Sequence, residues 1–312
     1  MTDRAGWPAI PFEPWKETCA ALHRYTQIVG KYRLAHTPCV NHSWHATLYV
    51  NANGLTTGLV PDGPGITVQL ELQHQRLVAS SSTGESDGFP LEPMSVATFD
   101  GRFKKVIAKL GGLPEYHGSP NELPEAIPFV EDAEARPWDA DAVSRFHRAL
   151  VRIDAVFNEF RTGFLGKVSP VHLFWGSFDL AVTRFSGRTA PLHPGGIPNL
   201  PDAVTREAYS HEVSSAGFWP GGGGIDEPCF YSYSYPTPDR FAEQPVGPAA
   251  ARFDKKLGEF VLPYEAVHSA PNPREVLLEF LGSTFDAAAG LASWDKHLTC
   301  AIGRKGLPRI IA

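Results

Sequence analysis

ITVQLELQ, residues 66–73, is the clearest strand in the sequence. Its apolar side chains occupy every second position, at Ile66, Val68, Leu70 and Leu72. A period of two places one face of a strand in the core and the other in water. Antiparallel sheets have this pattern, whereas the strands of a doubly wound parallel sheet are buried on both faces. We therefore expect an antiparallel or mixed sheet.

Helical patterns flank the strands. One helix is expected from about Trp15, one from Ser95 as its N-cap, one over Asp139–Leu165 and a last one from Pro273, because apolar residues recur there at helical spacing. Gly30 either ends the first of these helices or marks a close approach of another element. Helices beside antiparallel or mixed strands predict an α+β fold.

A proline-rich stretch over residues 113–138 divides the chain. It is interpreted as a linker or as a loop that wraps the protein. Residues 1–125 and 139–302 each contain a long helix, an aromatic-containing strand, further strands and a closing helix. LHR at residues 22–24 and FHR at 146–148 echo each other in the two opening helices. Two pseudo-repeated halves packed as one unit are one interpretation of this similarity.

Composition limits the class of protein. The chain has 312 residues, 43% of them hydrophobic and 20% charged, with a formal net charge of -6. A protein that binds nucleic acid needs a basic face, so this balance argues against one. No apolar run approaches the roughly 20 residues that span a bilayer, and residues 1–18 lack the apolar core of a secretion signal. We expect a cytoplasmic protein with no membrane or nucleic-acid partner.

Residues 168–224 concentrate polar groups among aromatic ones. If residues 171–185 form one strand, Asp179 and Trp175 share a face and His172 lies on the other. A buried Asp179 needs a partner, and Arg184 or Arg188 could supply an internal salt bridge. Alternatively, the two arginines recognise the carboxylate or phosphate of a substrate. Asp179, Trp175, Arg184 and Arg188 are therefore candidate substrate-binding residues.

Histidines recur in the same region and in one turn of the first half. The candidates are His42 and His45 in PCVNHSWH, His172, His193 in LHPGG, and His211. Two or three of them with a carboxylate could hold Fe(II) or Zn(II) and leave one position open. Each is also compatible with an ordinary hydrogen-bonding role.

A second cluster follows the HPGG loop. Glu207 and His211 are four residues apart, which would place them on one face of a helix as an acid–base pair or as an ion pair at its end. Glu212 is the third candidate for catalysis. Tyr233 and its alternate neighbours form either ordinary sheet packing or one wall of an aromatic pocket. No P-loop, GxGxxG, GxSxG or HExxH motif is present to name a reaction.

Several long segments carry a family resemblance. SPVHLFWGSFDLAVTRFSGR, HPGGIPN, EAYSHEVSSAGFWPGGGG and YSYSYP resemble signature segments of the bacterial domain-of-unknown-function family 5996, as do LHRYTQIVGKYRL and VNHSWHATLYVNANGLTT in the first half. The resemblance covers about residues 15–298. It implies that both halves form one unit and that the candidate histidines, acids and arginines belong to family motifs. It implies no activity, substrate or cofactor.

Two functions follow from these patterns. The first is an enzyme for a small polar, anionic molecule, which uses either a histidine- and carboxylate-bound metal or the acid–base pair of His211 with a glutamate. The second is a non-catalytic protein that binds a small molecule in an aromatic-lined pocket. Metal content and turnover distinguish the two.

Overall fold

The computed structural model describes residues 7–222 and 225–302, and the fold is α+β. Two antiparallel sheets contain its strands. The first half holds α1 (Lys16–His36), β1 (Tyr49–Val50), β2 (Leu55–Val60), β3 (Ile66–Glu71), β4 (Arg76–Ser81), β5 (Ser86–Pro90) and α2 (Val96–Lys109). Its strands lie in the order β1-β2-β3-β4-β5. Short 3-10 turns precede α1 and β1, at η2 (Glu13–Trp15) and η3 (Asn41–Ser43).

The second half has a larger sheet, in the order β10-β11-β9-β8-β7-β6. Its elements are α3 (Ala140–Arg161), β6 (His172–Phe174), β7 (Asp179–Thr189), α4 (Asp202–Ala208), β8 (His211–Trp219), β9 (Cys229–Tyr235), η4 (Phe241–Glu243), β10 (Arg252–Asp254), β11 (Glu259–Pro263), α5 (Tyr264–His268), α6 (Pro273–Leu291) and η5 (Lys296–Leu298). Both halves therefore run from a long helix through a sheet to a closing helix. A duplication stays a prediction.

The expected strand is confirmed over Ile66–Glu71, with residues 72 and 73 in the following turn, and the helix starts are confirmed. Ile66, Val68 and Leu70 of β3 are at most 1% exposed, and β3 pairs antiparallel with β2 and β4. The Ser95 side chain accepts a hydrogen bond from Thr98 N and so caps α2. Asp139 caps α3 in the same way, although α3 ends at Arg161 rather than Leu165.

Gly30 marks a close approach, because α1 continues past it to His36. A Cβ at Gly30 would overlap the Trp175 ring. The indole of Trp175 is 8% exposed, and its Nε1 donates to Ala46 O over 2.7 Å. Trp175 therefore joins α1, the chain before β1 and the second half.

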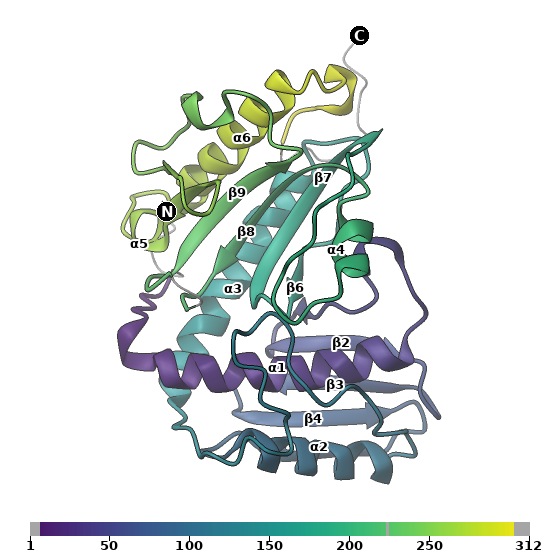
Figure 1. The fold of residues 1–312 in the computed structure, drawn as a ribbon. Coiled ribbons are helices and arrows are strands. Elements are labelled where there is room, and N and C mark those ends of the chain that lie inside the picture. The colour runs from purple at the N-terminus through teal and green to yellow at the C-terminus, as the bar shows by residue number, and fades with distance from the viewer. Residues whose placement is uncertain (1–6, 223–224, 303–312) are drawn as a thin grey trace.

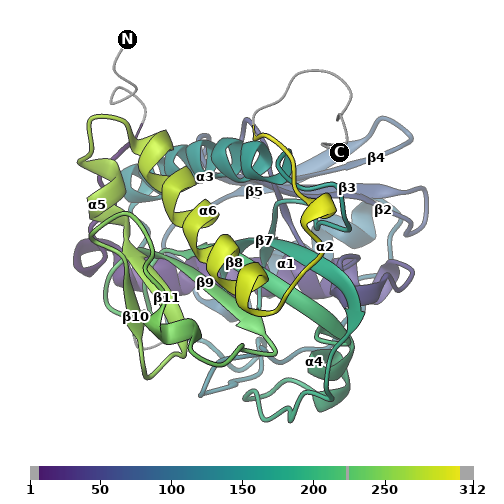
Figure 2. The ribbon, with the colours of Figure 1, turned by 90° about the horizontal axis from the view of Figure 1, so that it is seen from above.

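The helices cover opposite sides of the two sheets. In Figure 1, α1 and α2 lie in front of the smaller sheet, whereas α3 and α6 lie behind β7, β8 and β9. Figure 2 confirms that α3 and α6 cover one face of the larger sheet. Loops and the short helix α4 lie at the other face, which carries no long helix. We call it the front face.

A backbone bridge joins the two sheets. Leu48 and Leu173 exchange hydrogen bonds of 3.0 and 2.7 Å, which place the chain before β1 beside β6. One cluster of buried hydrophobic residues extends through both halves. No helix within the described residues is long and apolar enough to cross a membrane.

The expectation of one continuous strand from residue 171 to 185 is wrong. A turn at residues 175–178 folds the segment into a hairpin in which Phe174 pairs with Asp179 and His172 with Ala181. Residues paired directly across an antiparallel ladder point to the same face. His172 and Asp179 therefore share the front face. Counting by twos fails here because the turn interrupts the alternation.

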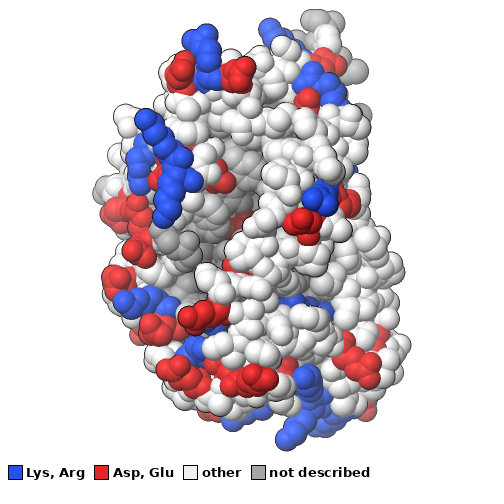
Figure 3. Space-filling model, viewed as in Figure 1, with Lys and Arg blue, Asp and Glu red and all other residues white. Residues whose placement is uncertain are grey.

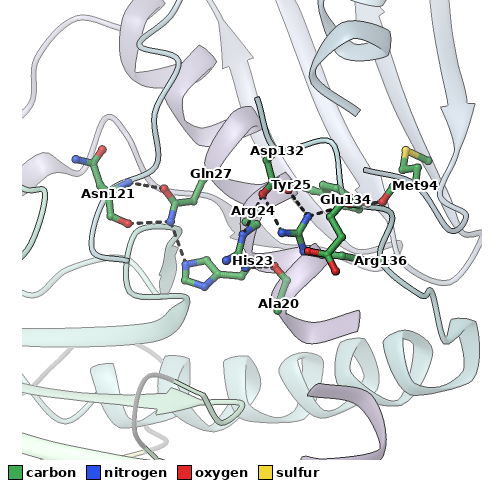
Figure 4. A network of polar contacts seen from close by, with 10 residues as sticks. All are labelled: Ala20, His23, Arg24, Tyr25, Gln27, Met94, Asn121, Asp132, Glu134 and Arg136. Carbon is green, nitrogen blue, oxygen red and sulfur yellow. Dashed lines mark hydrogen bonds and ion pairs between the residues drawn. The ribbon is translucent and has the colours of Figure 1, made fainter. Parts of the chain in front are cut away.

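The proline-rich stretch is a wrapping loop. Figure 4 shows how α1 holds it at two places. The Arg136 guanidinium binds Asp132 through two hydrogen bonds of 2.7 and 2.9 Å, and Arg24 Nε lies 3.6 Å from the same carboxylate. At the other place, the Gln27 side chain of α1 accepts from Asn121 N and donates to Asn121 O, over 2.8 and 2.9 Å.

Candidate functional site

The front face of the larger sheet carries a row of polar and aromatic side chains. Ala181, Gly217 and Tyr231 are paired directly across β7, β8 and β9, and Thr183, Ser215 and Tyr233 form the next row. Figure 3 shows a hollow in front of β8 and β9, with acidic side chains in and around it. We call this region the front hollow.

Asp179 is the buried carboxyl of the front hollow. It begins β7 and is 4% exposed. The Ser177 hydroxyl donates a hydrogen bond to Asp179 Oδ1, and the Tyr231 hydroxyl donates one to Asp179 Oδ2. Burial raises the pKa of Asp179, while these two hydrogen bonds oppose the rise. Gly217 lies beneath the Tyr231 ring, where a Cβ would overlap the phenol oxygen. The glycine thus gives Tyr231 the room to reach Asp179.

Two glutamates are electrostatically coupled to Asp179. Burial, followed by the charge of Asp179, raises the pKa of Glu122 to about 7 and that of Glu259 to about 8. Glu259 begins β11 beside β9, and its Oε2 is buried without a hydrogen-bond partner among the described residues. A buried carboxyl oxygen without a partner is unusual in a folded protein. The carboxyl of Glu259 is therefore available for a donor or acceptor on a ligand.

A lysine lies on the α1 side of Glu122. Lys31 is 3% exposed, and burial lowers its pKa to about 8. Its ammonium group donates to Asn121 Oδ1 and lies 5.2 Å from the centre of the Trp175 ring. The negative charge of Glu122 raises the pKa of Lys31, but this effect is smaller than the lowering caused by burial. An acid whose pKa is raised and a base whose pKa is lowered are thus electrostatically coupled to one another.

The wrapping loop positions Glu122. The clamp of Gln27 on Asn121 fixes the preceding residue, and Glu122 N donates to Pro198 O over 3.1 Å. Glu122 has a positive φ of 60°, a conformation that costs energy for a residue with a side chain. A Cβ at Gly176 would overlap the Glu122 carboxyl. Gly176 therefore leaves the space that this carboxyl fills.

Aromatic rings continue along the same face. The Trp219 and Tyr231 rings lie 4.3 Å apart between centres, and Tyr231 stacks on Tyr233 at 6.0 Å. The hydroxyl oxygens of Tyr233 and Tyr209 are 2.8 Å apart. His193 stacks on Tyr209 at 4.7 Å. Tyr233 and His193 therefore belong to an aromatic wall beside the three carboxyls, and His193 lies at its outer end.

The turn around His42 meets the segment around Glu207. Both Glu207 carboxylate oxygens accept from His42 N, over 2.8 and 2.7 Å. His42 Nε2 lies 2.6 Å from Lys167 Nζ, and the His42 and His211 rings are 6.2 Å apart. His45 instead binds Val40 O and N within its own turn, each over 3.1 Å. The contact between His42 and Glu207 ties the first half to α4.

Glu207 and His211 do not share a helix face. Glu207 is near the end of α4, which stops at Ala208, and His211 begins β8. The Glu207 carboxylate is occupied by the His42 backbone. His211 Nδ1 lies 3.1 Å from Ser210 Oγ. The geometry therefore assigns Glu207 to holding the turn rather than to an acid–base pair with His211.

The two arginines lie away from the front hollow. Arg184 is 3% exposed on the α3 side of the sheet, with its guanidinium 3.5 Å from the Phe160 ring centre and 4.3 Å from that of Phe285. The expectation that Arg184 binds a substrate anion does not fit this position, because strand alternation turns it into the core. Arg188 pairs with Glu212 over 2.7 Å. That pair lines a separate cavity of about 340 Å³ beside Trp294.

The candidate histidines do not form a metal site together. Among residues 7–222 and 225–302, no three His, Cys, Asp or Glu side chains are placed to hold a metal ion. His42 and His211 are neighbours, whereas His172, His193 and His45 each have different surroundings. The carboxyls of the front hollow are the stronger chemical cluster.

Several residues of the front hollow were not expected from the sequence. They are Lys31, Asn121, Glu122, Ser177, Tyr209 and Glu259. Ser177 had a local signal, since it stands two residues before Asp179 and can turn its hydroxyl back to it. Lys31, Glu122 and Glu259 come from three distant segments that only the packing of the wrapping loop and β11 brings to the sheet.

The comparisons with known proteins identify a family and nothing narrower. No curated protein and no solved structure matches the chain. The family model that matches is described as a family of unknown function, DUF5996, and it covers residues 7–300. That range includes both halves, the wrapping loop and the whole front hollow. The chain belongs to this family of unknown function.

Proposed function

We propose that the protein is an enzyme that catalyses proton transfer on a small polar molecule bound in the front hollow. One observation carries the proposal: the carboxyls of Asp179, Glu122 and Glu259 lie close enough for the charge of Asp179 to raise the pKa of both glutamates. Clusters of ionisable groups with perturbed pKa values in a hollow are typical of active sites. Structural carboxyls usually have a cationic or backbone partner instead.

The individual groups suit acid–base roles. A general acid or base works best when its pKa lies near the working pH. Glu259 and Lys31, with pKa values of about 8, and Glu122, with about 7, meet this condition. Asp179 is held in one orientation by Ser177 and Tyr231. We assign proton donation to Glu259, proton exchange to Glu122 with Lys31, and positioning of a substrate hydroxyl or amino group to Asp179.

The charge of the hollow favours a neutral or positively charged substrate. The sequence suggested an anionic one because of Arg184 and Arg188, but neither arginine reaches the front face. The charge of Asp179, which raises the pKa of both glutamates, repels a carboxylate or phosphate and attracts an amine, while Glu259, with a pKa of about 8, is mostly protonated at neutral pH and can donate a hydrogen bond to a neutral substrate. The histidine-bound metal is not part of the proposal, because the candidate ligands are dispersed.

A non-catalytic binding protein is the second candidate. The adjoining rings of Trp219, Tyr231 and Tyr233 favour it. Such a wall binds the apolar face of a sugar or the cation of an amine without chemistry. In that case the carboxyls would only hydrogen-bond the ligand.

A ligand panel followed by turnover tests the proposal. Thermal unfolding is measured with putrescine, arginine, glucosamine and glucose, and with citrate and glucose 6-phosphate as anionic probes. We expect stabilisation by neutral or cationic probes that disappears in Asp179→Asn and persists in Glu212→Gln, whose carboxyl lies outside the hollow. Proton NMR then follows each stabilising probe for conversion. If probes bind but neither they nor related compounds are converted, the result supports the non-catalytic binding protein. If only the anionic probes stabilise the protein, the result contradicts both the enzyme and the binding protein.

A further inference from the structure

An exposed lysine directs its ammonium group at a histidine instead of a carboxylate. Lys167 lies in the segment beside β7, where its carbonyl oxygen accepts from Phe185 N over 3.0 Å. Its Nζ lies 2.6 Å from Nε2 of His42, a residue of the first half. No carboxylate of the described residues lies within 4.0 Å of this Nζ. Because lysine heads usually stay in water or pair with an acid, this contact points to a special role.

The hydrogen bonds of His42 determine where its ring proton lies. Its Nδ1 is 3.0 Å from Ala208 O, and a carbonyl oxygen only accepts, so Nδ1 carries the proton. Burial lowers the pKa of His42, as do the charges of Lys167 and His211, so the ring is mostly neutral at pH 7. Its Nε2 lone pair therefore accepts from Lys167. A base that a third group orients beside a nucleophile is the arrangement that activates nucleophiles in enzymes.

The turn that presents His42 has a costly backbone conformation. His42 and Ser43 have positive φ angles of 59° and 57°, which are uncommon for residues with a side chain. Both carboxylate oxygens of Glu207 hold the His42 backbone N–H, over 2.8 and 2.7 Å. Strained residues that their surroundings hold in place concentrate at functional sites. The turn and Glu207 thus fix His42 Nε2 against the lysine.

Two aromatic rings border the lysine. Its Nζ lies 5.1 Å from the Trp44 ring centre and 4.8 Å from that of Phe185. Burial lowers the pKa of Lys167, and the charge of Glu207 opposes this by a smaller amount. The neutral amine therefore forms more easily than at an ordinary lysine. The rings and Glu207 in turn favour any product whose nitrogen regains a positive charge.

We propose that Lys167 is a reactive amine that forms an imine with a small neutral aldehyde, and that His42 is its base. His42 Nε2 takes a proton from the ammonium group, and the free Nζ adds to the carbonyl carbon. A proton then moves from this nitrogen to the oxygen, which gives a carbinolamine. Protonated His42 returns its proton to the carbinolamine hydroxyl, which leaves as water while the C=N bond forms. The products are a protonated imine, water and neutral His42.

The surroundings favour an imine over an amide, and a neutral aldehyde over an anionic one. A protonated imine keeps the positive charge that Trp44, Phe185 and Glu207 stabilise, whereas acylation of the amine would remove it. The negative charge of Glu207 disfavours a carboxylate or phosphate on the aldehyde. Trp44 is only half-buried and offers ring surface to an apolar body. This site is independent of the proposed function, since it shares no residue with the three carboxyls.

Reductive trapping on the full chain tests the proposal. The protein is incubated with benzaldehyde and sodium cyanoborohydride, which reduces a protonated imine to a stable benzylamine, and is then digested and mapped by mass spectrometry. At neutral pH we expect Lys167 to be labelled about tenfold or more faster than Lys105, an exposed lysine on α2. This ratio should fall to about one in urea, and it should be smaller for glyoxylate, the anionic probe.

The wild-type protein alone can overturn the proposal. Equal labelling of Lys167 and Lys105 in the folded chain does so, as does faster labelling of Lys31, the other lysine of lowered pKa. A preference for Lys167 that persists in urea assigns the reactivity to the local sequence and also overturns it. A larger ratio with glyoxylate than with benzaldehyde contradicts the neutral class of aldehyde.

Histidine variants separate the base from the turn. His42→Gln keeps a polar side chain that cannot take up the proton, and it should slow the labelling of Lys167 about tenfold or more. His45→Gln changes a histidine that contacts Val40 within the same turn, and it should leave the rate unchanged. Equal rates in the two variants overturn His42 as the base. If His42→Gln does not fold, the wild-type ratio of Lys167 to Lys105 decides the proposal.

Discussion

Glu259→Gln gives the sharpest test of the front hollow. The wild-type carboxyl has its pKa raised from 4.5 to about 8, mainly by burial and next by Asp179. Glutamine has the same shape and stays neutral at every pH. The variant therefore removes the titration of this group while it keeps the packing against β9.

The sign and size of the effect follow from proton linkage. A carboxyl whose pKa is raised by folding stabilises the folded state fully below its unfolded pKa, and this contribution is lost as pH rises through the folded pKa. For Glu259 the window runs from 4.5 to about 8. Each pH unit within it changes the free energy of unfolding by about 1.4 kcal/mol. From pH 5.5 to 7.5, wild type should lose up to about 2.7 kcal/mol relative to Glu259→Gln.

Urea denaturation of both proteins at these two pH values measures the difference. Glu131→Gln, which replaces an exposed glutamate on the wrapping loop, serves as the control and should show no such change. In an Asp179→Asn background the effect of Glu259→Gln should shrink, because one cause of the raised pKa is removed. An equal stability difference at both pH values would refute the reasoning, since Glu259 would then titrate alike in the folded and unfolded chains.

Three further substitutions test neighbouring features. Gly176→Ala should push the Glu122 carboxyl towards water, so that the pKa of Glu122 falls from about 7. Between about pH 5 and 7 the free energy of unfolding, measured by urea titration, should then change less with pH, by up to about 1.4 kcal/mol per pH unit. An unchanged pH dependence contradicts this prediction. Tyr231→Phe removes a hydroxyl donor to Asp179 and should lower the free energy of unfolding at neutral pH by about 1.5–3 kcal/mol. A variant as stable as the wild type would disprove this prediction. Arg184→Met replaces a buried cation by an apolar chain of similar size and should leave the free energy of unfolding unchanged or raise it. A decrease of more than about 2 kcal/mol in the free energy of unfolding would contradict this and assign the guanidinium an essential structural contact.

Local sequence patterns were sufficient for the elements and for much of the front face. The alternation of β3, the caps Ser95 and Asp139, and the shared face of Tyr231 and Tyr233 all depend on residues within a few positions of one another. Such patterns follow from strand and helix periodicity. For Tyr233 the same reasoning left two alternatives open, ordinary sheet packing or one wall of an aromatic pocket.

Alternation failed where a turn reset it. Residues 175–178 form the hairpin between β6 and β7, and so His172 lies on the same face as Asp179. The helix spacing of Glu207 and His211 failed for a related reason, because α4 ends between them. In both cases the sequence period was applied across a boundary that the chain alone did not mark.

The sequence by itself determined the α+β class, the antiparallel strands, most helix starts and Asp179 as a buried carboxyl in need of partners. Only the tertiary structure decided what those partners are. Ser177 is local, but Tyr231 comes from β9. The two glutamates whose pKa values Asp179 raises come from the wrapping loop and from β11. Periodicity reports which face a side chain occupies, whereas burial, charge coupling and pKa depend on which distant segments cover that face. The raised pKa values that support a proton-transfer site are therefore properties of the packed chain.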